Sequence, residues 1–281
     1  MSIFMSLFLG LIQGIAEFLP ISSSGHLAIF QNLFNLNYTE EGNLLFEVML
    51  HLGTFVSICV VYRTEIKSMI TEGIEFLRRR SDSDSDEPVV LKPSGRTLLF
   101  VLVATLPMVI GLFFRGSIAS LFSVTIFVGF ALIITGGLLF VSERYISQGN
   151  KTEKTMTLAD AFIIGLAQMV ATLPGLSRSG TTITVGLARG LSGSFAIRFS
   201  LLLALPAILG STIVELYLAI REGIDFSLFF IYLAGFAVAA VVGFFAIQLI
   251  RRVMARGRFG TFAYYCWGAG ALTILLSLVL N

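Results

Sequence analysis

Long apolar stretches dominate the chain, and six of them can each cross a bilayer. A hydrocarbon core of about 30 Å requires roughly 20 apolar residues in a helix. Such stretches lie at residues 43–62, 97–115, 119–141, 196–218, 227–250 and 261–280. The hydrophobic pattern therefore predicts six transmembrane helices.

Two further apolar segments, at about 3–35 and 158–190, are each interrupted midway by proline, glycine and a serine cluster. Proline removes a helical hydrogen bond and clashes with the preceding turn. Interrupted helices occur at membrane depth where they line a protein cavity. We expect each segment to form two half-helices joined by a loop, a re-entrant hairpin that enters and leaves on one face.

The two interrupted segments are copies of one unit. One reads Gln13-Gly-Ile-Ala-Glu-Phe-Leu-Pro-Ile-Ser-Ser-Ser-Gly-His26, and the other reads Gln168-Met-Val-Ala-Thr-Leu-Pro-Gly-Leu-Ser-Arg-Ser-Gly-Thr-Thr182. Gly-Leu-x-Gln opens both copies, at Gly10 and Gly165, which are separated by 155 residues. Ser-Gly closes both copies at the same separation, so the similarity holds along the whole unit.

Each copy is followed by three spans, and the second set has the opposite orientation. The sequence therefore predicts an all-α polytopic membrane protein with an inverted-topology repeat, in one integral membrane domain over residues 1–281. Repeat one covers about 1–141 and repeat two about 158–281. In such folds the site forms near the midplane, where the broken helices of the two halves meet.

Composition agrees with this class. Hydrophobic residues make up 56% of the 281 residues and charged residues 13%, against about 25% charged in soluble domains. The mean hydropathy is +0.90. Cys59 and Cys266 offer neither a disulfide framework nor zinc-ligand spacing, so we expect small core residues. The N-terminus lacks the features of a removable signal peptide, so we expect Met1 onward to be retained.

Most of the 19 Lys and Arg residues fall on one face of the predicted topology. They are Arg63, Lys67, Arg78, Arg79, Arg80, Lys92, Arg96, Arg144, Lys151, Lys154, Arg189, Arg198, Arg251, Arg252, Arg256 and Arg258. The positive-inside rule makes this face cytoplasmic and both termini external. Residues of about 64–96 then form a cytoplasmic loop, whose Ser-Asp run at 81–87 has no apolar face to bury.

Gln13 and Glu17 lie four residues apart, on one face of the first half-helix. Ionisable groups at membrane depth are costly and are functional by default. Glu17 is predicted to be a metal ligand or a base, with Gln13 supplying a neutral oxygen to the metal. The structural alternative is a carboxylate that only braces Arg178 or caps a loop.

Ser22, Ser23, Ser24 and Gly25 follow Pro20 and precede an apolar helix. Serine is a preferred N-cap, but capping explains one serine and not three. A helix N-terminus that follows a Ser/Gly loop presents free N–H groups to phosphate oxygens. This segment is therefore predicted to bind phosphate.

The second copy repeats the arrangement with Ser177, Arg178, Ser179, Gly180 and Thr181. It adds a guanidinium, which is always charged and binds phosphate bidentately. An arginine between serines, facing a second anion-binding helix end, predicts a phosphate held between two half-helices. Packing alone is the alternative for this arginine.

His26 follows the first serine loop directly. Beside Glu17 and the serines it is predicted to be a general acid, base or nucleophile, with a hydrogen-bonded interior histidine as the alternative. His51 and Glu47 are also polar and intramembrane, and they either support the site from outside or pack helices.

This set of residues suits phosphoryl transfer, which requires stabilised phosphate oxygens and a positioned nucleophile. The sequence has no Walker loop, nucleotide fingerprint or Cys/His zinc spacing, which argues against a nucleotide and gives no sign of nucleic acid binding. A phosphate site open to the membrane interior indicates a lipid that carries phosphate or diphosphate.

On these motifs the chain resembles the bacterial undecaprenyl-pyrophosphate phosphatases, also called bacitracin resistance proteins. The matches are the (E/Q)xxxE pattern at Gln13–Glu17, continued to His26, and the PGxSRSGxT pattern at Pro174–Thr182. The resemblance implies hydrolysis of the terminal phosphate of a C55 polyprenyl diphosphate, with Mg²⁺ or Ca²⁺, which recycles the lipid carrier for peptidoglycan precursors. It implies the bacterial inner membrane as the location.

The resemblance also implies roles for individual residues. Those carried over as most needed are Glu17, Ser23, His26 and Arg178. In the mechanism that we favour, the diphosphate is held by Arg178 with Ser177, Ser179 and Thr181. Glu17 binds the metal or orients the nucleophile, and either Ser23 or His26 attacks or activates water. The predicted topology opens the site to the external face, with the prenyl chain in a lateral groove. Whether the protein forms a homodimer is left open.

A lipid-phosphate transporter or flippase is the competing function, because inverted repeats with broken helices are a transporter architecture. The two copies differ in a way that favours chemistry. Glu17 and His26 in one copy correspond to Thr172 and Thr181 in the other, and a symmetric carrier has little need of this difference. A purely structural scaffold would not require clustered intramembrane charge.

Overall fold

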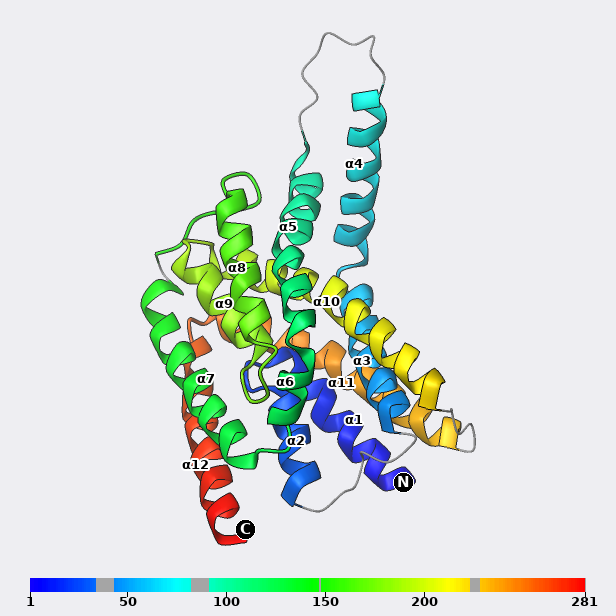
Figure 1. The fold of residues 1–281 in the computed structure, drawn as a ribbon. Coiled ribbons are helices and arrows are strands. Elements are labelled where there is room, and N and C mark those ends of the chain that lie inside the picture. Colours follow the sequence, from blue (N-terminus) through cyan, green and yellow to red (C-terminus); the bar gives the residue numbers. More distant parts are fainter. Residues whose placement is uncertain (34–42, 82–90, 147, 223–227, 281) are drawn as a thin grey trace.

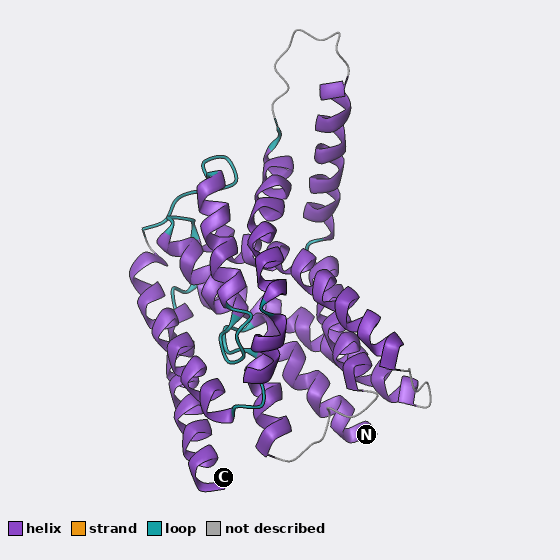
Figure 2. Cartoon of the chain, viewed as in Figure 1, coloured by secondary structure: helices purple, strands orange, loops and turns teal. Residues whose placement is uncertain are grey.

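The structure is a computed structural model that describes residues 1–281 except 34–42, 82–90, 147, 223–227 and 281. Figure 2 shows helices joined by loops, and the described part of the chain contains no strand. The helices are α1 (Ile3–Phe18), α2 (Ser23–Leu33), α3 (Asn43–Val61), α4 (Arg63–Ser81), α5 (Pro93–Phe113), α6 (Arg115–Leu121), α7 (Thr125–Ile146), α8 (Leu158–Val170), α9 (Arg178–Ala188), α10 (Gly193–Glu222), α11 (Phe229–Ala255) and α12 (Phe262–Leu280), with a 3-10 turn at Phe259–Thr261.

The prediction of an all-α polytopic membrane protein is confirmed. Among the described residues, α5, α7, α10, α11 and the turn plus α12 are long and apolar enough to cross a membrane. A sixth span results if α3 and α4, bent by 79° at their junction, are counted as one. The predicted span at 119–141 begins too early, because Arg115–Leu121 forms the separate short helix α6.

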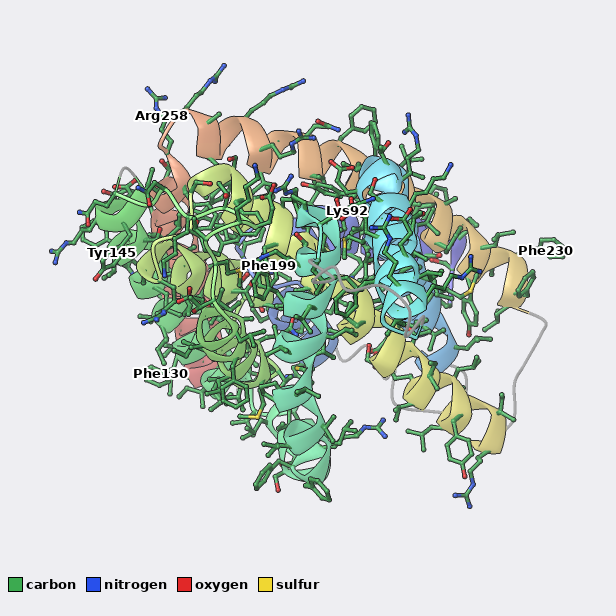
Figure 3. The ribbon with its side chains drawn as sticks, turned by 90° about the horizontal axis from the view of Figure 1, so that it is seen from above. Lys92, Phe130, Tyr145, Phe199, Phe230 and Arg258 are labelled. Atoms are coloured by element: carbon green, nitrogen blue, oxygen red, sulfur yellow. The ribbon has the colours of Figure 1, made fainter. Side chains whose placement is uncertain are left out.

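The outer surface of the bundle is apolar, as contact with lipid requires. Phe230 at the start of α11 is 80% exposed and points away from the bundle in Figure 3. Phe113 at the end of α5 is 85% exposed. The interior is filled by fully buried side chains such as Phe18, Ile58 and Phe199. Apolar residues therefore cover both the core and the lipid-facing surface, which explains the composition.

The prediction of a loop at about 64–96 is wrong for its first half. Residues Arg63–Ser81 form α4, with Ile66, Ile70 and Ile74 at helical spacing among the charged side chains. Residues 82–87 of the Ser-Asp run lie outside the described residues. Figure 1 shows α4 projecting from the end opposite both termini. Which end is cytoplasmic stays a prediction.

Both predicted helix breaks are confirmed. The first break follows Leu19, which is extended, and contains Ser22 with a φ of 69°. This left-handed value is uncommon for a residue other than glycine. The second break contains Gly175 with a φ of 92°, which glycine adopts without steric cost. In Figure 1, α1 reaches this region from the end with both termini, and α8 reaches it from the end with α4.

The two broken segments make equivalent helix crossings. A Cβ added to Gly10 of α1 would lie 2.5 Å from the carbonyl oxygen of Gly235 in α11. At the equivalent position of the second copy, a Cβ on Gly165 of α8 would lie 2.2 Å from the carbonyl oxygen of Ala104 in α5. Small residues allow membrane helices to approach this closely. The repeated glycine therefore serves the same crossing in both halves of an inverted repeat.

We predict that Gly165→Ala destabilises the protein, because the new methyl group must push α8 and α5 apart. Overpacking of this kind costs typically ~1–3 kcal/mol. The apparent Tm in detergent should fall relative to wild type. Gly210→Ala is the matched control, because a Cβ there meets nothing within 4 Å, and its Tm should be unchanged or higher. Equal Tm values for the two variants would contradict the close crossing.

Candidate active site

The loops of the two broken helices pack against each other reciprocally. A Cβ on Gly25 would lie 2.9 Å from the Cα of Gly175, and a Cβ on Gly180 would lie 3.2 Å from the Cβ of Pro20. Pro20 and Gly175 are equivalent positions of the two copies, as are Gly25 and Gly180. The N-terminal ends of α2 and α9 therefore meet around a local two-fold axis, as the repeat predicted.

One serine of each copy caps its half-helix. Ser22 Oγ accepts a hydrogen bond from the backbone N–H of Gly25 at 3.1 Å, and Ser177 Oγ accepts one from Gly180 at 3.1 Å. Ser179 Oγ donates to the carbonyl of Leu19 in the opposite loop at 3.3 Å. The capping alternative is therefore correct for one serine per copy. The positions that follow the caps remain available for other roles.

Those next positions are Ser23 and Arg178, and both donate to Glu17. Ser23 Oγ donates to Glu17 Oε2 at 2.6 Å, and Gln13 Nε2 donates to the same oxygen at 3.0 Å. Arg178 Nη2 donates to Glu17 Oε1. Glu17 is 8% exposed, so this carboxylate is buried with a cation and two neutral donors. The predicted placement of Gln13 and Glu17 on one helix face is confirmed.

Arg178 is not saturated by this pairing. Its Nη1 is buried and has no hydrogen-bond partner among the described residues. A guanidinium has five N–H donors in a planar fork, so it can bind two acceptors at once. The pairing with Glu17 therefore occupies one terminal nitrogen of Arg178 and leaves the other able to donate to a second acceptor.

A cavity of about 210 Å³ lies at this point. Its walls include polar side chains from both loops, namely Glu17, Ser22, Ser23, Ser24, Ser177 and Arg178. The other predicted phosphate-binding residues are not part of its lining, namely Gly25, Ser179, Gly180 and Thr181. Gly25, Ser179 and Gly180 belong to the loop contacts that hold the two half-helices together. The structure thus brings most of the predicted polar residues to the lining of one cavity.

His26 is directed elsewhere. Its Nδ1 is hydrogen-bonded to the carbonyl of Ser22 at 2.7 Å, and its Nε2 to the hydroxyl of Tyr265 in α12 at 2.7 Å. The imidazole also stacks on the Tyr265 ring. The structure does not place His26 in the lining of the cavity that contains Glu17. This geometry matches the interior hydrogen-bonded alternative, and a catalytic role for His26 stays a prediction.

The cavity lining includes two residues that sequence reasoning missed as candidates. Glu215 of α10 lies within the predicted span at 196–218, so the rule that singled out Glu17 could have found it. Gln168 of α8 is the second-copy equivalent of Gln13. The cavity lining also includes His51 of α3. The sequence predicted that His51 would either support the site without lining it or pack helices together. Its Nδ1 lies 3.9 Å from Glu215 Oε2.

The predicted metal ligands Glu17 and Gln13 have few oxygen atoms that are free to bind a cation. Both carboxylate oxygens of Glu17 already accept hydrogen bonds from protein donors. Of the side-chain oxygens of these two residues, only Gln13 Oε1 has no hydrogen-bond partner among the described residues. Arg178 already supplies positive charge here. No cluster of three or more His, Cys, Asp or Glu suited to a metal occurs in the described ranges. The donor set at Glu17 therefore does not fit a bound cation while Arg178 is paired there.

Comparison with known proteins gives a consistent result. Residues 6–272 match the family described as "Bacitracin resistance protein BacA". An undecaprenyl-diphosphatase of Halothermothrix orenii is 38% identical over 279 residues, which cover 99% of each chain. One of Alkaliphilus metalliredigens is 38% identical over 282 residues, with 99% of this chain and all of that protein covered. One of Methanosphaera stadtmanae is 35% identical over the full length of both chains.

We predict that Arg178→Ala lowers stability by about 3 kcal/mol, because it leaves the buried Glu17 carboxylate without its cation. The double variant Glu17→Gln with Arg178→Ala should recover much of this loss, since no buried charge remains. Thermal unfolding in detergent measures both effects. The control is Lys92→Ala, which removes the exposed Lys92–Glu75 pair and should change stability by less than ~1 kcal/mol. A double variant less stable than Arg178→Ala would contradict the pairing.

Proposed function

Because the chain belongs to the bacitracin resistance protein family, we propose that it is a membrane phosphatase that hydrolyses undecaprenyl diphosphate to the monophosphate and inorganic phosphate. This activity recycles the carrier lipid for peptidoglycan synthesis and confers bacitracin resistance. The observation that carries the proposal is the Ser23–Glu17–Arg178 contact in the lining of a cavity where two half-helix N-termini meet.

The cavity suits the terminal phosphate in both charge and donors. Arg178 Nη1 is a cationic donor without a partner among the residues that the structure describes, and Ser24 and Ser177 belong to the same lining. The adjacent helix N-termini add partial positive charge. In this proposal these groups bind the phosphate oxygens and stabilise the charge that they carry in the transition state.

The hydrogen bond between Ser23 and Glu17 supports the nucleophile assignment. Its length of 2.6 Å is within the range for proton transfer to a base. Ser23 Oγ attacks the terminal phosphorus and transfers its proton to Glu17, and the bond from phosphorus to the bridging oxygen breaks. Polyprenyl monophosphate leaves, and a water molecule then hydrolyses the phosphoserine. His26, bound to Tyr265, is the less favoured of the two candidates.

A divalent cation, Mg²⁺ or Ca²⁺, is part of the proposal. When bound, it would neutralise diphosphate charge that one arginine does not balance. The proposal also includes the bacterial inner membrane as the location and an opening toward the periplasm or exterior. The charge asymmetry of the chain supports that orientation.

The difference between the two copies favours hydrolysis over transport. At the position equivalent to Glu17, Thr172 donates its hydroxyl to its own backbone at Met169 O, 2.7 Å away. The second copy therefore has no carboxylate to pair with Ser177 or its neighbours. A carrier that alternates between two faces needs equivalent binding from both halves, whereas a catalyst needs one base.

We predict phosphate release from undecaprenyl diphosphate by the purified protein in detergent supplied with Mg²⁺. Arg178→Lys should lower kcat by ~10²–10³-fold, because a lysine cannot bond Glu17 and the phosphate through one planar fork. Arg144→Lys, an exposed change at the end of α7, is the matched control and should retain wild-type rates. Folded wild type that releases no phosphate would contradict the phosphatase and favour the transporter.

A second set of variants separates the two candidate nucleophiles. Ser23→Ala should lower kcat by more than ~10³-fold, as the loss of a nucleophile does in other covalent mechanisms. Tyr265→Phe removes only the hydroxyl that holds His26 and should change kcat much less. Steady-state phosphate release measures both. The opposite order of effects would assign the nucleophile to His26.

A further inference from the structure

A second polar group in the cavity lining comes from α3 and α10. His51 Nδ1 and Glu215 Oε2 lie 3.9 Å apart, beyond hydrogen-bond distance. Both atoms are buried and have no hydrogen-bond partner among the described residues. Leaving a buried donor or acceptor unsatisfied costs about 1–3 kcal/mol. Two such atoms facing the same space therefore indicate a ligand that is bound between or beside them.

Gln168 gives an independent indication of a polar ligand. It is 1% exposed and belongs to the same cavity lining. Neither its Nε2 nor its Oε1 has a hydrogen-bond partner in the described part of the chain. Its counterpart Gln13 donates to Glu17, four residues on, whereas the residue four after Gln168 is Thr172, which bonds to the backbone. The amide of Gln168 is thus left free for a ligand in the cavity.

The charges of the cavity identify the kind of ligand. Glu17 is paired with Arg178, but Glu215 has no cationic partner closer than His51 in the described residues. A free carboxylate would repel a diphosphate that enters the same small space. A divalent cation between them reverses the sign of this interaction. Magnesium sites of this kind use one or two carboxylates and complete the coordination with substrate phosphates and water.

We propose that Glu215 and His51, and not Glu17 and Gln13, form the site of the divalent cation, with Gln168 directed at the same ligand. Because the described residues contain no cluster of three or more His, Cys, Asp or Glu that could hold a metal, the other coordination positions would be taken by diphosphate oxygens and water. A carboxylate with phosphate and water oxygens suits Mn²⁺ as it suits Mg²⁺ and Ca²⁺, and Mn²⁺ is paramagnetic, which makes this ion a practical probe. This inference rests on the proposed phosphatase function.

The test is Mn²⁺ binding to the purified protein in detergent, measured by electron paramagnetic resonance with and without inorganic diphosphate. Glu215→Gln and His51→Gln should each weaken binding by at least about tenfold, whereas Glu17→Gln should bind Mn²⁺ as wild type does. Glu75→Gln, an exposed carboxylate on α4, is the control for non-specific binding. Gel filtration and the metal-free Tm establish that each variant is folded, and His51→Gln carries the test if Glu215→Gln is not.

Two results would overturn the assignment. One is loss of Mn²⁺ binding in Glu17→Gln with retention in Glu215→Gln, which would place the cation at Glu17. The other is a wild type that binds no Mn²⁺ in either condition. Phosphate release is measured in parallel on the wild type. Release without a Mn²⁺ site at Glu215 contradicts only the cation assignment, and Mn²⁺ binding without release contradicts only the phosphatase function.

Discussion

The ion pair between Glu17 and Arg178 links the two halves of the molecule, and the site depends on it. Each charge lies on a broken helix inside an apolar bundle, where an unpaired charge is strongly unfavourable. The pair forms only because the two loops meet closely, with glycine at the contact in each loop. The packing of the two loops and the pairing of the two charges therefore depend on each other. The cavity lies at the point where the loops meet and the charges pair.

The backbones of the two copies are related by the repeat, but three side-chain differences make the copies chemically unequal. Ser23 and Arg178 occupy equivalent positions, and Glu17 corresponds to Thr172. Gln13 donates to Glu17, whereas its counterpart Gln168 has no hydrogen-bond partner in the described part of the chain. Two identical half-helix ends would bind phosphate symmetrically and release it to either side. In the proposed mechanism Glu17 and Ser23 on one end carry out the attack, and the guanidinium on the other end stabilises the charge. In that mechanism the asymmetry between the copies is what makes an anion-binding scaffold a catalyst.

The sequence was sufficient for features set by local chemistry or by the repeat. Pro20 and Gly175 marked the helix breaks, and the spacing of Gln13 and Glu17 placed them on one face. The direction of His26 could not be predicted, because it depends on Tyr265, which lies 239 residues away on α12. The helix α4 was missed because its charges outweighed an isoleucine pattern at helical spacing. Glu215 was not predicted as a site residue because the stretch at 196–218 was identified as a span by its apolar length alone.

Arginine is the residue type that this electrostatic arrangement demands at position 178. Within the cavity Glu17 and Glu215 are acidic and a diphosphate adds further negative charge, while Arg178 is the one permanent cation of the lining. A lysine ammonium is a single point charge, so binding a phosphate oxygen would draw it away from Glu17. The guanidinium keeps Nη2 on Glu17 while Nη1 remains available. In the proposed mechanism the carboxylate then stays bonded to Ser23 when a phosphate binds, and Glu215 is the acidic side chain of the lining that Arg178 does not pair with.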